Sequence, residues 1–95
     1  MSVVLPVDRL LDTDTLIAFY HPAPSYQVHI LLVPKRAIAD LSSITPDDSA
    51  FLSELFQSVR ILVDRYDLDL KGYRLIANGG KYQTLPYLHF HLISD

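Results

Sequence analysis

Two histidines near the carboxyl end of the chain are the residues best suited to do chemistry. His89 and His91 lie in an alternating stretch, residues 87–93, and side chains on a β-strand repeat every second residue. A strand here therefore presents both imidazoles on one face and apolar side chains on the other. Imidazoles brought together tend to depress each other's pKa values, and a neutral imidazole can act as a base, a nucleophile or a metal ligand.

A third histidine, His29, lies within the apolar run 28–33, on a strand that can neighbour the first. Two histidines at alternate positions plus one from an adjacent strand can bind zinc. No acidic residue or cysteine lies near the pair, and the nearest polar residues upstream are Gln83 and Thr84. A zinc site is thus one alternative, but the spacing alone does not favour it.

The segment before the last predicted strand supplies polar donors. Asn78, Gln83 and Thr84 provide amide and hydroxyl groups, and Gly79 and Gly80 let backbone N–H groups approach a ligand closely. Such loops suit phosphate oxygens, although an ordinary glycine turn between two strands would have the same composition. Beside histidines, these donors favour phosphoryl or nucleotidyl transfer, in which one group attacks phosphorus while others stabilise charge on its oxygens.

Composition narrows the class of protein. The chain has 95 residues, 49% hydrophobic and 20% charged, which predicts one soluble domain spanning residues 1–95. Its net charge of −3 argues against a nucleic-acid polymer as partner, and the lack of cysteine excludes disulfides and thiolate chemistry. Residues 1–6 lack the features of a secretory signal, and no apolar run approaches the roughly 18 residues of a membrane span. We therefore expect a cytoplasmic protein without membrane contact.

Short strands and one long helix must position these groups. Thr45 is a helix N-cap, Pro46 fits the first helical position, and apolar residues then recur at three- and four-residue spacing, with Phe56 among them, to about Tyr66 or Asp67. A short helical turn is expected over 38–41. The predicted strands are 9–11, 16–20, 28–33, 72–78 and 87–93. This order predicts an α+β fold, a five-stranded, mainly antiparallel sheet covered by one helix.

Two blocks of the sequence resemble the motifs of the histidine triad family. Gln83–Ile93 is similar to the family signature, in which histidines alternate with apolar residues along the last strand. Phe19, His21 and Pro24, followed by His29–Ile38, resemble the second motif, a histidine entering an apolar strand that ends in Pro-Lys. The resemblance covers nearly the whole chain, and the expected order of strands and helix agrees with it.

The resemblance implies an enzyme that hydrolyses or transfers nucleoside monophosphate derivatives, such as phosphoramidates, phosphoesters or dinucleotides, without a cofactor. His89 matches the nucleophile, which would form a nucleotidyl-histidine intermediate that water resolves. His91 matches the last triad position, and His29 the upstream histidine that completes the cluster. The resemblance further implies a nucleotide or nucleotide-derived partner, and a homodimer formed through the long helix and the strand 72–78.

Further residues are assigned by the same resemblance. Gln83 and Thr84 match phosphate contacts, with Thr84 positioned to bond the leaving group, and Asn78 resembles another phosphate contact in a loop that is shorter here. Phe19 corresponds to part of the wall against the base. His21 stands where the family usually has an acid that binds the ribose hydroxyls.

Tyr87 stands where the first triad histidine is expected. A phenol stays neutral until a pH near 10, so it cannot carry protons as an imidazole does at neutral pH. The sequence therefore leaves two hypotheses open. One is a nucleotidyl hydrolase or transferase, and the other is a nucleotide-binding or interaction module with little or no catalysis.

Overall fold

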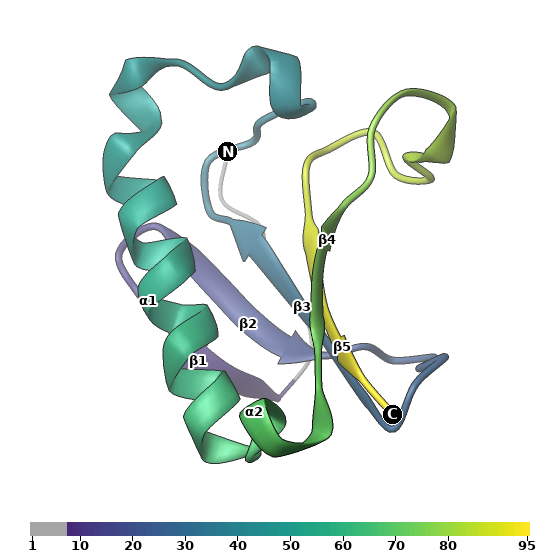
Figure 1. The fold of residues 1–95 in the computed structure, drawn as a ribbon. Helices are drawn as coiled ribbons and strands as arrows, with labels where there is room; N and C mark the ends of the chain where they lie inside the picture. The colour runs from purple at the N-terminus through teal and green to yellow at the C-terminus, as the bar shows by residue number, and fades with distance from the viewer. Residues whose placement is uncertain (1–7) are drawn as a thin grey trace.

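The chain forms an antiparallel sheet with one long helix lying across a single face (Figure 1). The computed structural model describes residues 8–95, so the segment 1–6, which was inspected for a secretory signal, lies outside the described residues. The strands are β1 (Arg9–Asp12), β2 (Leu16–Tyr20), β3 (Val28–Pro34), β4 (Arg74–Ala77) and β5 (Phe90–Ser94). They lie in the order β1-β2-β3-β5-β4, and every neighbouring pair is antiparallel. The predicted α+β fold is confirmed.

Strand β3 is the centre of the sheet. All seven of its residues are buried, as expected of a strand composed mainly of Val, Ile and Leu. It pairs with β2 on one side and with β5 on the other, and opposite residues include Leu31 with His91 and His29 with Ile93. Residues directly opposite one another in an antiparallel pair lie on the same face of the sheet. This register brings the histidines of two distant segments together.

The two faces of the sheet carry different side chains. The helix side holds the main core, to which β3 contributes Ile30 and Leu32 and β5 contributes Leu92. The opposite face, hereafter the open face, carries a smaller apolar cluster of Ile17, Phe19, Leu31 and Val33. His29 and His91 also lie on the open face, which is turned away from helix α1 (Figure 1).

Helix α1 (Ser49–Arg65) begins where the sequence predicted. Thr45 accepts a hydrogen bond from the N–H of Asp47, and the side chain of Asp48 accepts one from the N–H of Thr45. A 3₁₀ turn, Pro46–Asp48, leads into the helix, and Asp48 also accepts hydrogen bonds from Arg36. The helix buries Phe51, Leu55, Ser58, Val59, Leu62 and Val63. A short helix, α2 (Leu68–Lys71), follows it.

Two sequence predictions about helical residues need correction. Phe56 was predicted to lie on the apolar stripe of the helix, but it is 62% exposed. The helical turn expected over 38–41 lies instead at Leu41–Ser43, because the side chain of Asp40 accepts hydrogen bonds from the hydroxyls of Ser42 and Ser43. Ile38 is consequently left in an extended segment with its side chain buried.

The last strand is shorter than predicted. We expected it to begin at Tyr87, but β5 begins at Phe90. Phe90 pairs with Leu32 of β3 and with Ala77 of β4, and these are the last pairs on both sides, so residues 87–89 have no neighbouring strand. The N–H of Leu88 instead donates to the carbonyl of Ile38, 2.7 Å away. Alternation persists, because Leu88 is fully buried in the main core.

Glu54 joins helix α1 to the turn between β1 and β2. One oxygen of its carboxylate accepts hydrogen bonds from the hydroxyls of Thr13 and Thr15 and from the N–H of Thr15. The Thr15 hydroxyl is the main cause that holds the pKa of Glu54 below its usual value.

Across residues 8–95, no helix is both long and apolar enough to cross a membrane.

We predict that Glu54→Ala lowers the free energy of unfolding by clearly more than an exposed substitution nearby, because it leaves part-buried donors of the turn without their acceptor. Urea unfolding at neutral pH measures the change. Gln57→Ala, three residues after Glu54 but exposed and bonded only to Ser53, should change it by less than about 0.5 kcal/mol. Equal effects of the two substitutions would contradict the role given to Glu54.

Candidate active site

All four histidines of the chain lie in a row on the open face. The ring centroids are 4.4 Å apart for His21 and His29, 5.2 Å for His29 and His91, and 4.9 Å for His91 and His89. The sequence predicted that His89, His91 and His29 would cluster, and the structure brings them together. It also adds His21, which follows β2 and whose ring packs against that of His29.

Hydrogen bonds fix the proton positions within this row. The N–H of Ser25 donates to Nδ1 of His29 at 3.1 Å, so this nitrogen is an acceptor and the ring proton of neutral His29 is on Nε2. That proton can be donated to Nδ1 of His91, which lies 2.9 Å away. His91 therefore carries its own proton on Nε2 when it is neutral. The N–H of Ala23 likewise donates to Nδ1 of His21 at 3.0 Å.

The ring of His89 is oriented by its own segment. Its Nδ1 lies 3.1 Å from the carbonyl oxygen of Tyr87, and a carbonyl can only accept, so Nδ1 carries the proton. Nε2 is therefore left with a free lone pair. The residue is 6% exposed, and its ring faces a cavity rather than the main core. An uncharged imidazole with one nitrogen held by a backbone carbonyl and the other unprotonated has the form of a nucleophile or base.

Burial and neighbouring rings keep two members of this row, His29 and His91, uncharged. Burial is the larger cause that lowers the pKa of His29, and His21 adds to it. Burial also lowers the pKa of His91 to about 4, with smaller contributions from His89, His29 and His21. A protonated His91 would carry a hydrogen on Nδ1, opposite the N–H that His29 already points at this nitrogen. This repulsion between two donors also lowers the pKa of His91. His29 and His91 are thus neutral at physiological pH.

Two cavities flank the row of histidines. One, of about 220 Å³, has walls formed by the apolar cluster and the segment before β5, and is lined by Phe19, His21, Pro22, Leu31, Val33, Leu85, Tyr87 and His89. The other, of about 250 Å³, lies toward β4 and is lined by Tyr26, His29, Ile76, Asn78, His91 and Ile93. We call them the apolar cavity and the β4-side cavity. A ligand centred on the histidines can extend into both.

The sequence-predicted binding residues divide between these places. Phe19 and His21 line the apolar cavity, and Asn78 lines the β4-side cavity. Gln83 and Thr84 line neither. The amide of Gln83 donates to the carbonyls of Ala39 at 2.8 Å and Leu85 at 2.9 Å, so its nitrogen stabilises the loop, whereas Thr84 is exposed.

Sequence reasoning missed Tyr26. Its ring meets that of His29 edge-on, with centroids 5.3 Å apart, and it lines the β4-side cavity. The only available signal was its place three residues before His29, in a loop whose path the sequence does not specify.

Within residues 8–95, no three His, Cys, Asp or Glu side chains are arranged to hold a metal ion, so the zinc alternative finds no ligand set there.

Comparison with known proteins supports the family suggested by the motifs. The HIT domain model, which describes the histidine triad family, matches residues 3–95. An uncharacterized HIT-like protein of Helicobacter pylori is 32% identical over 92 residues, covering 95% of this chain and 86% of that protein.

Solved structures show the same fold. A HIT family hydrolase from Legionella pneumophila superposes with a TM-score of 0.87 at 27% identity, covering 95% of this chain and 82% of that one. A histidine triad nucleotide-binding protein from Candida albicans gives 0.80 at 31% identity, covering 93% of this chain and 65% of that one. The fold and the histidine-lined face thus define a HIT-like domain. The chain belongs to the HIT domain family.

The depressed pKa of His91 predicts how stability depends on pH. Between its ordinary value of 6.5 and about 4, the unfolded chain binds a proton that folded His91 does not. The free energy of unfolding should therefore fall as pH is lowered through this window. Urea unfolding from pH 7 to pH 4 measures the slope, and His91→Asn should make it shallower. Superimposable slopes for the two proteins would contradict the neutral state assigned to His91.

Proposed function

We propose that this protein hydrolyses or transfers nucleoside monophosphate derivatives through a nucleotidyl group carried on His89. The observation that carries the proposal is the free Nε2 of His89 at the wall of the apolar cavity, with Nδ1 held by the Tyr87 carbonyl. The Legionella pneumophila relative is described as a hydrolase and the Candida albicans one as a nucleotide-binding protein. Both descriptions are compatible with such a site.

The chemistry proceeds in two displacements. Nε2 of His89 attacks the phosphorus of the nucleotide, a P–N bond forms, and the leaving group departs with the electron pair of its bond to phosphorus and takes up a proton. The ring becomes cationic, and its Nδ1–H keeps its hydrogen bond to the Tyr87 carbonyl, which stabilises the developing charge. Water then attacks phosphorus and loses a proton to the solvent, which balances the proton that the leaving group took from solvent; the P–N bond breaks, and the nucleoside monophosphate is released with His89 neutral again.

The apolar cavity is the proposed site of the nucleoside. Phe19, Leu31 and Val33 form an apolar wall suited to a base, and His21 stands at its edge next to His29. We assign Asn78 to the phosphate, since it lies in the cavity that contains His91. Gln83 and Thr84 are assigned to the phosphate oxygens and the leaving group by their family positions. Because neither residue lines a cavity, both can contact the substrate only after the 83–85 loop rearranges.

Tyr87 supports a second candidate function, a nucleotide-binding module without turnover. Its side chain lines the apolar cavity beside His89, with ring centroids 6.5 Å apart, at the position assigned to the first triad histidine. A phenol there can donate a hydrogen bond but cannot shuttle a proton at neutral pH. Binding of AMP or GMP by calorimetry, without hydrolysis of any derivative, would favour this candidate.

We predict that the protein hydrolyses a fluorogenic adenosine phosphoramidate and that His89→Ala slows the reaction by more than about 10³-fold, because the attacking nitrogen is lost. Release of the fluorescent amine measures the rate. Arg60→Gln, an exposed change on helix α1, is the matched control and should retain the wild-type rate. Equal rates for the wild type and His89→Ala would overturn the proposal.

We also propose a homodimer formed through helix α1 and strand β4. Strand β4 is an edge of the sheet, so its outer backbone groups lack a partner strand among residues 8–95. On helix α1, Phe56 is 62% and Ile61 47% exposed. Exposed apolar side chains and an unpaired strand edge are both features suited to a second copy of the chain.

Sedimentation at micromolar concentration should give twice the monomer mass of 10.8 kDa. Phe56→Glu should shift the equilibrium to the monomer, because it places a charge on the proposed contact surface. Lys71→Glu, an exposed change on α2, is the control and should leave the mass unchanged. A wild-type monomer at this concentration would refute the dimer.

A further inference from the structure

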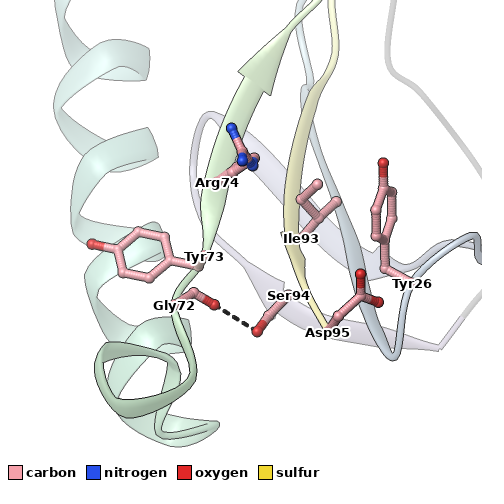
Figure 2. Close-up of a pocket in the computed structure, with 7 residues that line it drawn as sticks. All are labelled: Tyr26, Gly72, Tyr73, Arg74, Ile93, Ser94 and Asp95. Carbon is pink, nitrogen blue, oxygen red and sulfur yellow. Dashed lines mark hydrogen bonds between the residues drawn. The ribbon is translucent and has the colours of Figure 1, made fainter.

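A third cavity, of about 380 Å³, lies where β4 and β5 meet the end of β3 (Figure 2). Arg74 and Tyr26 are among its lining residues. Tyr26 and Ile93 line both this cavity and the β4-side cavity, so the two share a wall. The two cavities are therefore adjacent, with Tyr26 and Ile93 between the histidines and Arg74.

The sheet register places Arg74 on the face that carries the histidines. Arg74 is opposite Ile93, and Ile76 is opposite His91, in the pairing of β4 with β5. Arg74 and His91 are thus diagonal neighbours on one face, a relation that spans about 7–8 Å and is within reach of a long side chain. Figure 2 shows Arg74, Ile93 and Tyr26 in this order across the cavity, with Tyr73 turned toward helix α1.

The charge of Arg74 is not neutralised within the described part of the chain. The ion pairs there involve Arg9, Lys35 and Arg36, and no side-chain hydrogen bond of residues 8–95 includes the Arg74 guanidinium. Asp95 also lines the cavity but forms no ion pair with Arg74, and its carboxylate accepts from the N–H of Gln27 at 3.4 Å.

We infer that Arg74 is a specificity-determining residue that binds an anionic group, a carboxylate or a phosphate, on the leaving-group side of the substrate. This inference rests on the proposed function and names the substrate class. With the nucleoside in the apolar cavity and phosphorus beside His89, the remaining part of the substrate extends through the β4-side cavity toward Arg74. A guanidinium there forms paired hydrogen bonds with two oxygens of either anion.

The test uses three AMP phosphoramidates with leaving amines of matched length. Propylamine is neutral, β-alanine carries a carboxylate and phosphoethanolamine carries a phosphate, so the two anionic compounds distinguish the two sources of charge. The rate of AMP release is measured by chromatography for the wild type, Arg74→Gln, Arg74→Lys and the control Arg60→Gln. Thermal unfolding verifies that each variant is folded.

We expect Arg74→Gln to lower kcat/KM for at least one anionic compound by about 10- to 100-fold, the range for a hydrogen bond to a charged group. Its kcat/KM for the propylamine compound should stay within about twofold of wild type. Arg74→Lys should recover part of the loss, and Arg60→Gln should behave as wild type. The compound with the larger loss identifies the preferred anion.

An equal loss for the neutral and anionic compounds, or no loss for either anionic compound, would overturn the inference while leaving the proposed hydrolysis intact. If the wild type hydrolyses none of the three, the proposed turnover fails, and calorimetric binding of the same compounds then tests Arg74 alone. Tighter binding of an anionic compound that is lost in Arg74→Gln would support the inference. Equal binding of all three, or no binding, would overturn it.

Discussion

The pairing of β3 with β5 is the constraint on which the site depends. Side chains on a strand alternate between the faces, so one register decides both the core and the chemistry. With Leu31 opposite His91, the neighbouring pair of Ile30 and Leu92 packs beneath the helix, while the imidazoles face outward. A slip of one residue would place histidines in the main core and leucines on the open face. The apolar half of each strand therefore enforces the geometry of the polar half.

The row of imidazoles is ordered by backbone groups rather than by acidic partners. The N–H of Ser25 sets the proton position of His29, which in turn sets that of His91, and the carbonyl of Tyr87 sets that of His89. Many catalytic histidines are oriented by a carboxylate, which raises their pKa. Here burial lowers the pKa of His29 and His91 instead, so these rings stay neutral without any compensating charge.

Local signals were sufficient for much of the fold. The start of helix α1 follows from Thr45 and Pro46, and the burial of β3 from its composition, because both depend on residues near in sequence. The predicted start of β5 was wrong by three residues, because its pairing with β3 stops at Leu32, although β3 continues to Pro34, and its other neighbour β4 ends at Ala77. Both limits depend on parts of the chain distant in sequence. Phe56 fits the helical spacing, yet its side chain is left exposed, which spacing along the helix alone does not reveal.

The candidate site was predictable where it depends on residues close together in sequence, and not where it depends on the path of a loop. Alternation placed His89 and His91 on one face, and the resemblance between motifs suggested His29. The contact of Tyr26 with His29 depends on the path of the loop between β2 and β3, which no residue pattern specifies. The contact between the rings of His21 and His29 likewise depends on the turn at residues 21–23.

Residues 87–89 approach the row of histidines without belonging to the sheet. They are attached by the buried side chain of Leu88 and by one backbone hydrogen bond to Ile38. Substitution at position 87, or a change in the length of the preceding loop, therefore disturbs no ladder. The scaffold and the segment that carries His89 can therefore diverge independently, so descendants of one ancestral fold can change the lining of the apolar cavity while their cores stay the same.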